Sequence, residues 1–281
     1  MVLIESLLKI ILRPDRWKYD SIGYCPSCDR KTMFLLSLHM QNHLLKLISC
    51  WKSSPAFKET LLQRENILCG ICNANFRMRA LADTVLKLLN MSQTSELANR
   101  LWKQRDFFVY ETAAHLVFRA DTLKAVNNYV VSEFFEDQPA GALVHTMRNE
   151  NLEQLTFADN TFDILISSDV LEHVGNIEKA LSEIKRVVKP GGFHVFTVPV
   201  DNELPKTRER ARISRGNVEY LLEPVRHSDS LREEGILVFR DFGKDIIDYM
   251  SRDGFMCQEV VYEKNGMPIT SVFYAKKNVN E

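Results

Sequence analysis

Residues 149–199 decide the fold class: NENLEQLTFADNTFDILISSDVLEHVGNIEKALSEIKRVVKPGGFHVFTVP. An apolar run at 162–167 predicts a buried strand, and apolar residues at helical spacing over 177–188 predict a helix. The Lys-Pro-Gly-Gly sequence at 189–192 predicts the end of that helix and a turn into a second strand at 193–199. A strand, a loop, a helix and a second strand in this order form the repeating unit of a parallel sheet.

Further short apolar runs flank this stretch from about Phe107 onward. We expect strands at Phe107–Tyr110, Tyr129–Val131, Ala142–His145, Met256–Tyr262 and Thr270–Ala275. Continuous apolar strands that alternate with helices indicate a parallel sheet covered by helices on both faces. We therefore predict an α/β, Rossmann-like, doubly wound and mostly parallel sheet over residues 106–281. In such sheets ligands bind at the carboxyl ends of the strands, at the topological switch point.

Residues 1–105 have a different character, set by two C-x-x-C pairs at Cys25/Cys28 and Cys69/Cys72. Two such turns supply four soft thiolates, which suits a closed tetrahedral Zn²⁺ site with a structural role. Helix-like stretches at 35–48 and 55–63 separate the pairs, so we predict a zinc-ribbon domain with a helical insertion. Disulfides and a redox C-x-x-C are the alternatives. The other two cysteines, Cys50 and Cys257, are expected to be buried apolar residues.

Charge also divides the chain. Residues 1–105 hold 16 Lys/Arg and 8 Asp/Glu, whereas the remaining residues hold 20 and 29. This asymmetry suggests two functions, or two solvated regions that attract each other. The sequence has no run of the ~18 apolar residues that a membrane span needs. Residues 1–13 resemble an amphipathic helix more than a signal peptide, so we expect a cytoplasmic protein with no membrane partner.

Two arginines and two histidines of the N-terminal region each have two alternative roles. Arg77 and Arg79 follow the second cysteine pair and could bind a phosphate or nucleic acid, or could solvate a helix start. His39 and His43 stand four residues apart, and we expect them on a plain helix surface rather than at a metal.

The motif string of residues 149–199 is similar to that of class I S-adenosylmethionine-dependent methyltransferases, in particular the type 11 group. Its elements here are L-T-F, F-D-I, V-L-E-H-V and V-K-P-G-G. A narrower resemblance links the chain to bacterial methyltransferases with an N-terminal zinc ribbon and an arginine-rich exit. That resemblance rests on CPSC, CGIC, NANFRMRAL, Arg226-His-Ser-Asp229 and Leu237-Val-Phe-Arg-Asp-Phe-Gly243. It implies S-adenosylmethionine as the cofactor.

The resemblance also implies which residues bind that cofactor. Glu111 matches the acidic position after the first strand, and Ala113 with Ala114 stands where the class has glycines. Glu133 matches the carboxylate that accepts hydrogen bonds from the ribose hydroxyls. The remaining positions are Asn151 and Leu152 at the adenine, and Ser168 and Asp169 over the sulfonium end.

Catalysis in this class is mainly positioning of the acceptor, with a general base where the acceptor is a hydroxyl. The candidates are His173, and His227 with Asp229 as its orienting carboxylate; Glu172 is expected to cap the following helix. The absence of an N-P-P-Y tetrapeptide argues mildly against a nucleobase or amide nitrogen as the acceptor. We therefore expect O-methylation of a sugar or other small metabolite. The alternatives are a zinc-ribbon RNA methyltransferase, with nucleic acid bound by the basic N-terminal half, and a non-catalytic scaffold that has lost the glycine-rich loop.

Overall fold

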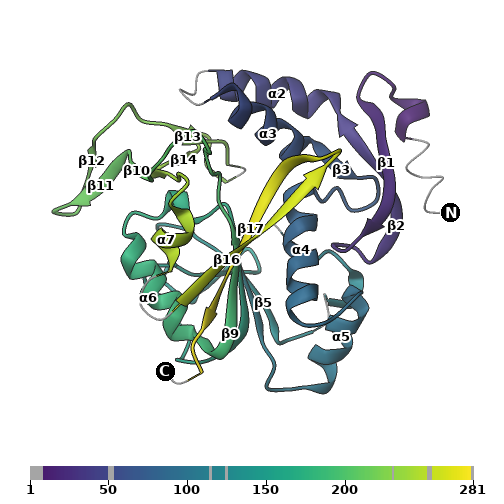
Figure 1. The fold of residues 1–281 in the computed structure, drawn as a ribbon. Coiled ribbons are helices and arrows are strands. Elements are labelled where there is room, and N and C mark those ends of the chain that lie inside the picture. Colours follow the sequence, from purple (N-terminus) through teal and green to yellow (C-terminus); the bar gives the residue numbers. More distant parts are fainter. Residues whose placement is uncertain are drawn as a thin grey trace. The chain divides into compact units, whose positions relative to one another are not determined.

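The computed structural model describes residues 9–49, 54–113, 116–123, 126–229, 231–251 and 255–279. The chain forms two compact units (Figure 1). Unit 1 comprises residues 1–107, 115–129 and 260–272, and unit 2 comprises 108–114, 130–259 and 273–281. Unit 1 therefore takes in two stretches from beyond residue 105.

Unit 1 combines a small antiparallel sheet with four helices. The sheet has the order β1 (Trp17–Cys25), β2 (Arg30–Ser37) and β3 (Ile67–Cys69). The helices are α2 (Leu38–Ser49), α3 (Pro55–Asn66), α4 (Phe76–Leu88) and α5 (Thr94–Lys103), with a 3₁₀ turn η1 (Asp121–Leu123). The helix expected from residue 35 begins only at Leu38, because Leu35 and Leu36 pair with β3. An apolar run alone does not distinguish a strand end from a helix start.

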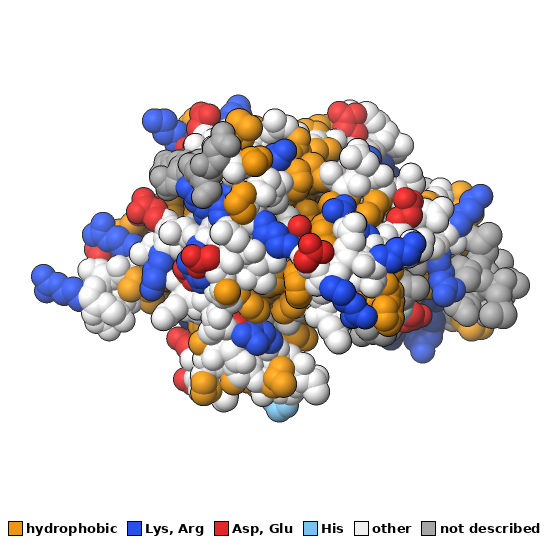
Figure 2. Space-filling model, turned by 90° about the horizontal axis from the view of Figure 1, so that it is seen from below, with side chains coloured by type: hydrophobic (Ala, Val, Ile, Leu, Met, Phe, Trp, Pro, Cys, Tyr) orange, Lys and Arg blue, Asp and Glu red, His pale blue; other side chains and the backbone are white. Residues whose placement is uncertain are grey.

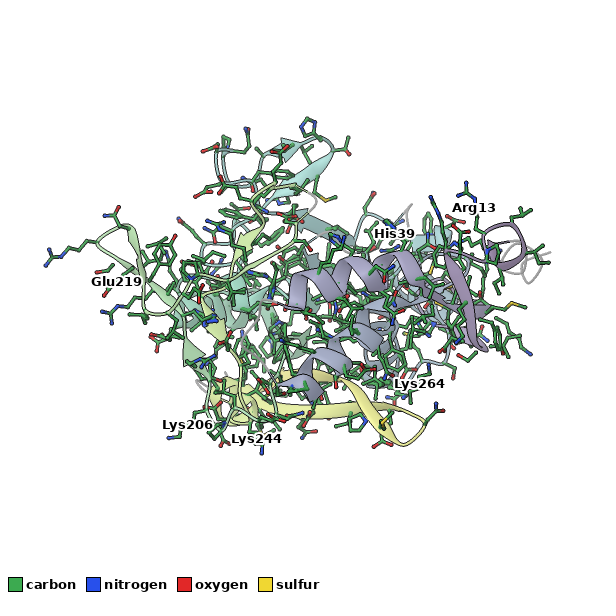
Figure 3. All side chains as sticks on the ribbon, turned by 90° about the horizontal axis from the view of Figure 1, so that it is seen from above. Arg13, His39, Lys206, Glu219, Lys244 and Lys264 are labelled. Carbon is green, nitrogen blue, oxygen red and sulfur yellow. The ribbon has the colours of Figure 1, made fainter. Side chains whose placement is uncertain are left out.

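Local signals fix the helix starts of unit 1. Ser54 accepts a hydrogen bond from the backbone N–H of Phe57 and is followed by a proline, as expected at a helix N-terminus. His39, labelled in Figure 3, and His43 are exposed on α2, which confirms the helix-surface prediction. Of the N-terminal helix expected over residues 1–13, residues 9–12 are helical, and residues 1–8 lie outside the described residues, as does Cys50.

Unit 2 is built on a mostly parallel eight-stranded sheet, which confirms the predicted α/β, Rossmann-like class. The strand order is β16-β17-β9-β8-β4-β5-β7-β6. The strands are β4 (Val109–Thr112), β5 (Tyr129–Glu133), β6 (Leu143–Val144), β7 (Met147–Asn149), β8 (Phe162–Ser168), β9 (Val188–Thr197), β16 (Phe255–Lys264) and β17 (Met267–Lys277). Strands β4, β8 and β9 are parallel, as are β5 and β7, whereas β6 and β17 pair antiparallel to their neighbours.

The core of unit 2 lies between this sheet and helix α6 (Ile177–Val187), with α7 (Ile246–Met250) contributing to it. Ile177, Ala180, Ile184 and Val187 form the buried face of α6 that the spacing predicted. The Asn176 side chain caps this helix by accepting from the N–H of Lys179. The prediction that Glu172 is the cap is therefore wrong.

The helix ends at Val187, as the Lys-Pro-Gly-Gly segment predicted, and β9 begins at Val188. Residues 189–192 form a bulge in β9, because Val188 pairs with Phe162 and Phe193 pairs with Ile164 of β8. Gly191 has φ +78°, a conformation that favours glycine. A Cβ on Gly192 would lie 2.8 Å from the carbonyl oxygen of Asp163. The two glycines thus let the bulged backbone pass close to Asp163 before pairing with β8 resumes at Phe193.

Residues 208–241 form three two-stranded antiparallel sheets. They pair β10 (Arg208–Glu209) with β15 (Arg240–Asp241), β11 (Ala211–Ser214) with β12 (Asn217–Tyr220), and β13 (Arg226–His227) with β14 (Ile236–Leu237). This segment contacts the 3₁₀ turn η2 (Leu171–His173) after β8, where the N–H of Phe239 donates to the carbonyl of Glu172 at 2.8 Å. No sequence signal placed these strands beside η2.

Among the described residues, no helix has the length and apolar character to cross a bilayer. On the face drawn in Figure 2, basic and acidic side chains are interspersed rather than segregated.

Candidate functional site

The topological switch point of the unit 2 sheet lies beside β4. The chain continues from β4 to β5 and β7 on one side of it, and to β8 and β9 on the other. Thr112 at the end of β4 pairs with Ser167 of β8, and β8 ends one residue later at Ser168, so Ala113 and Asp169 leave the sheet at the same edge. Glu133 ends β5 opposite Asn149 of β7. In open α/β sheets this edge is where ligands bind.

Ala113 holds the backbone conformation that a glycine would adopt. Its φ is +59°, in the left-handed region, although it carries a Cβ. Such a conformation costs an L-residue with a side chain roughly 1–2 kcal/mol. The turn after β4 is thus kept in this chain without the glycines that make it easy to form; Ala114 lies outside the described residues.

The predicted acidic positions differ in exposure. Glu111 is fully buried within β4. Glu133 is half-buried at the strand end, where its Oε1 accepts the N–H of Phe134 at 2.8 Å. That bond fixes the carboxylate at the edge of the sheet, where a ribose could reach it.

The two residues predicted at the adenine lie in the turn after β7. The Asn151 Oδ1 accepts the N–H of Glu153 at 2.9 Å, so one of its lone pairs serves the turn. Leu152 is buried in the core of unit 2. Ser168 is buried at the end of β8, and Asp169, the next residue, has φ +52° and accepts from the Thr197 hydroxyl at 2.8 Å.

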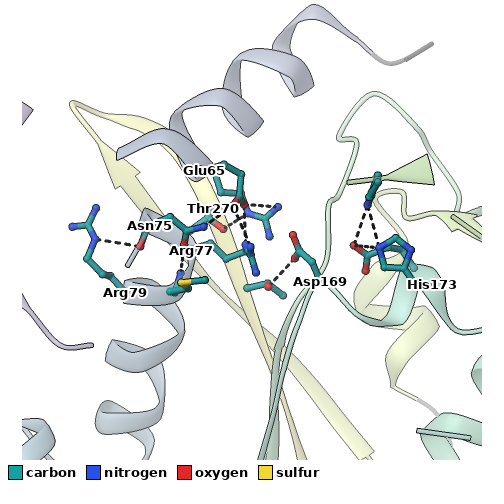
Figure 4. Close-up of polar contacts among 12 residues, drawn as sticks. Glu65, Asn75, Arg77, Arg79, Asp169, His173 and Thr270 are labelled. Carbon is teal, nitrogen blue, oxygen red and sulfur yellow. Dashed lines mark hydrogen bonds and ion pairs between the residues drawn. The ribbon is translucent and has the colours of Figure 1, made fainter. Parts of the chain in front are cut away.

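His173 and His227, 54 residues apart in sequence, come together in unit 2. Their rings meet edge to face with centroids 4.8 Å apart, and His227 Nδ1 lies 3.2 Å from His173 Nε2. His173 Nδ1 donates to the carbonyl of Leu237 at 2.8 Å, which leaves Nε2 facing His227. Burial lowers the pKa of His173. Glu172 completes a triangle with them, with Oε1 3.7 Å from His173 Nε2 and 3.9 Å from His227 Nδ1; His173 is labelled in Figure 4.

Asp229, predicted to orient His227, is held by a different partner. Its carboxylate accepts from the guanidinium of Arg232 and from the N–H of Leu231 at 3.1 Å. Arg232 also donates to the carbonyl of Phe134 at 2.5 Å, just after β5. Asp229 and Arg232 therefore fasten the segment that carries His227 to the β5 end of the sheet.

The four predicted zinc ligands converge in unit 1. Cys25 and Cys72 have Sγ atoms 3.9 Å apart, and Cys28 and Cys69 have theirs 3.8 Å apart. All four Sγ atoms lie within 4.8 Å of one another. A tetrahedron with metal–sulfur bonds of ~2.3 Å has edges of about 3.8 Å. The thiols can therefore hold one metal ion.

The backbone of the two cysteine turns is alike, as a tetrathiolate site requires. In each turn the residue after the second cysteine, Asp29 or Asn73, has a positive φ of 60° or 58°. Each donates its N–H to the carbonyl of the first cysteine at 2.9 Å. Asp and Asn tolerate this conformation better than other residues with side chains.

Hydrogen bonds among the four thiols shift their pKa values in opposite directions. Hydrogen bonding to the neighbouring Cys28 thiol raises the pKa of Cys25, whereas hydrogen bonds from Cys25 and Cys28 lower the pKa of Cys69. Arg79 lies close by, with its guanidinium 3.8 Å from the ring centroid of Phe34. Burial lowers the pKa of Arg79, and the charges of Cys25 and Cys69 act against that shift.

Arg77 and Arg79 are both buried, so neither of the two predicted roles holds. Arg77 donates to both carboxylate oxygens of Glu65, at 2.8 and 3.1 Å, and Arg79 donates to the carbonyls of Ile67 and Asn75 (Figure 4). Their side chains neither solvate the helix start nor face a nucleic-acid backbone. The sequence could not reveal this, because a charged residue at a helix start is normally exposed.

Comparison with known proteins bears on β6 to β9. Residues 138–196 match the family model described as a methyltransferase domain. The match covers about a fifth of the chain and includes the loop that carries Asp169 and His173.

Sequence relatives match about a third of the chain. A ubiquinone/menaquinone biosynthesis C-methyltransferase UbiE from Hydrogenovibrio crunogenus is 36% identical over 110 residues, which are 34% of this chain and 43% of the relative. A sarcosine/dimethylglycine N-methyltransferase from Aphanothece halophytica is 32% identical over 101 residues, 35% of this chain and 33% of the relative. The chain thus spans less than half the length of these curated relatives.

Solved structures match more of the chain, but weakly. An S-adenosylmethionine-dependent methyltransferase from Mesorhizobium loti has a TM-score of 0.38 at 16% identity, covering 61% of this chain and 91% of its own. The 1,6-didemethyltoxoflavin-N1-methyltransferase from Burkholderia thailandensis, solved with S-adenosylhomocysteine, has a TM-score of 0.38 at 13% identity, covering 92% and 100%. TM-scores this low do not establish a shared fold.

Proposed function

We propose that this chain is an S-adenosylmethionine-dependent methyltransferase that methylates an oxygen of a small metabolite, such as a sugar. The observation that carries the proposal is the edge of the unit 2 sheet at the switch point. There the glycine-like turn at Ala113 and the carboxylate of Glu133 flank neighbouring strand ends. The match of residues 138–196 to a methyltransferase-domain family model supports the same reading.

Each predicted cofactor residue receives a role from its place at that edge. Glu133 accepts hydrogen bonds from the ribose hydroxyls, with its second oxygen bound to Phe134. Asn151 and the backbone of Leu152 border the adenine. Glu111, Ala113, Ser168 and Asp169 border the methionine part, where Ala113 lets the backbone approach. The sulfonium carries an activated methyl group, so the protein's task is to align the acceptor with it.

On the acceptor side we place His173 and His227, with Asp229 as a positioning residue. His173 lies in the 3₁₀ turn η2 after β8, and His227 lies on β13 in the segment that packs on η2. An imidazole can take the proton from an acceptor hydroxyl as the methyl group is transferred. The named relatives are C- and N-methyltransferases, so the oxygen acceptor rests on these side chains alone.

In unit 1 we propose a structural Zn²⁺ held by Cys25, Cys28, Cys69 and Cys72. The sulfur–sulfur distances and the matched turns support it. When bound, the ion neutralises the thiolates and joins β3 to the β1–β2 turn. The burial of Arg77 and Arg79 removes a reason to favour an RNA substrate.

Calorimetry with S-adenosylmethionine tests the cofactor assignment. The wild-type chain is expected to bind, and Glu133→Gln to bind about tenfold more weakly, since it loses hydrogen bonds to a charged acceptor worth about 1.5–3 kcal/mol. Glu136→Gln is the matched control, because Glu136 is exposed three residues later. Absence of binding by the wild-type chain would refute the enzyme and leave the scaffold alternative. Equal affinity of the two variants would refute the role of Glu133.

A further inference from the structure

Two imidazoles and a buried carboxylate lie together at η2, which is more than a single general base requires. Glu172 is 2% exposed, and its Oε1 lies 3.7 Å from His173 Nε2 and 3.9 Å from His227 Nδ1. The two ring nitrogens are 3.2 Å apart. We propose that Glu172, His173 and His227 form a second metal site, for a divalent transition-metal ion such as Zn²⁺, distinct from the four cysteines.

The size of this triangle fits an ion. Sides of 3.2, 3.7 and 3.9 Å have a circumscribed circle of radius about 2.1 Å, which equals the ~2.0–2.2 Å bonds of Zn²⁺ to imidazole nitrogen and carboxylate oxygen. An ion at the centre would lie almost in the plane of its three ligands. Three protein ligands leave the coordination of such an ion incomplete, as in catalytic Zn²⁺ sites that take a substrate or water.

A backbone carbonyl holds His173 in the orientation that a metal ligand requires. His173 Nδ1 donates to the carbonyl of Leu237 at 2.8 Å, and a carbonyl can only accept. The proton of the neutral ring is therefore on Nδ1, and Nε2 presents a lone pair to the centre of the triangle. Metal-bound histidines commonly donate their other N–H to a backbone carbonyl in this way.

The backbone holds the three ligands together although they come from two distant segments. Glu172 and His173 lie in η2, and its carbonyl at residue 172 accepts the N–H of Phe239 at 2.8 Å. His227 lies on β13, which pairs with β14 at Ile236 and Leu237. Arg240 donates to the carbonyl of Leu171 at 2.5 Å. The segment 226–240 is thus tied to η2 through Phe239 and Arg240.

The ligand set selects the kind of ion. Two imidazoles and one carboxylate suit Zn²⁺ or another first-row divalent ion, and they are harder ligands than the four thiolates of unit 1. On the proposed function, the open positions would take the acceptor's oxygen, and the ion would lower the pKa of a bound hydroxyl. The two histidines then contribute to methyl transfer by binding this ion. The preferred acceptor is a molecule whose oxygen can bind the ion as a ligand.

Zinc stoichiometry tests the site. Metal-free chain is dialysed to equilibrium against micromolar Zn²⁺, and bound zinc is measured by elemental analysis. The wild-type chain is expected to bind one ion per chain more than His227→Gln and than Glu172→Gln. His39→Gln is the matched control, since His39 is exposed on α2, and should keep the wild-type count. Because the side chain of His227 is 21% exposed, its replacement is the variant least prone to disturb the core.

Two outcomes overturn the proposal: equal zinc counts in wild-type chain and His227→Gln, or an equal loss in His39→Gln. The first would leave the two rings joined by a hydrogen bond from His227 Nδ1. Cys69→Ser separates the two sites, because it should lose a different ion and keep the one at His227. Calorimetry with S-adenosylmethionine in chelator tests the cofactor site independently, so a failure of the proposed function is distinguishable from a failure of the metal site.

Discussion

Replacing Ala113 by glycine is expected to stabilise the protein, although glycine usually destabilises. Ala113 has φ +59°, which costs roughly 1–2 kcal/mol for a residue with a Cβ and almost nothing for glycine. Glycine in turn increases the entropy of the unfolded chain, which costs about 0.4–1 kcal/mol. The difference predicts that Ala113→Gly raises the free energy of unfolding by about 0.5–1 kcal/mol.

Ala142→Gly is the matched control. Ala142 is also half-buried in a loop of unit 2, but it is not among the residues with positive φ. Only the entropic cost applies there, so this variant should lose about 0.4–1 kcal/mol. The two alanine-to-glycine changes are thus predicted to differ in sign.

Urea unfolding of both variants and the wild-type chain measures the difference, provided that all three have the same denaturant dependence. If Ala113→Gly loses as much stability as Ala142→Gly, the loop after β4 is not strained in the folded protein. Calorimetry on the same variant adds a functional reading. A stabilised Ala113→Gly that binds S-adenosylmethionine no more weakly than wild type fits a loop that already has the glycine conformation.

Three further changes test other parts of the structure. Cys69→Ser should abolish zinc binding at the four cysteines and lower the unfolding midpoint of unit 1, since such ions supply folding energy; Cys257→Ala, at a buried thiol outside the cluster, should leave zinc content unchanged. Burial lowers the pKa of His194 to about 3 in the folded protein, against ~6.5 in the unfolded chain. The free energy of unfolding is therefore highest above pH 6.5 and falls by up to about 1.4 kcal/mol for each pH unit as the pH drops toward 3. Urea titrations from pH 7 to 4.5 should show a shallower loss for His194→Gln, and parallel curves would contradict this. Glu150→Gln should cost about 2 kcal/mol, because the buried carboxylate accepts from Arg148 at 2.6 Å and from Thr156; a loss below about 0.5 kcal/mol would contradict that role.

The sequence predicted the parts of this protein that depend on neighbouring residues. Apolar spacing over 177–188 and continuous runs such as 162–167 were sufficient for α6 and β8. The C-x-x-C pairs were sufficient to nominate four ligands that do converge. The sequence also predicted the end of α6 before Gly191 and Gly192, but not that these glycines form a bulge inside β9.

Only the tertiary structure decided which distant residues meet. His173 and His227 were both candidates in the sequence, but the contact between them and the place of Glu172 in the same cluster depend on how residues 226–240 pack on η2. Likewise, the left-handed backbone of Ala113 could not be read from an alanine, which disfavours it. Periodicity and turn chemistry act over a few residues and are written in the sequence. Long-range contacts and strain are set by the whole chain's packing, which no short stretch of sequence contains.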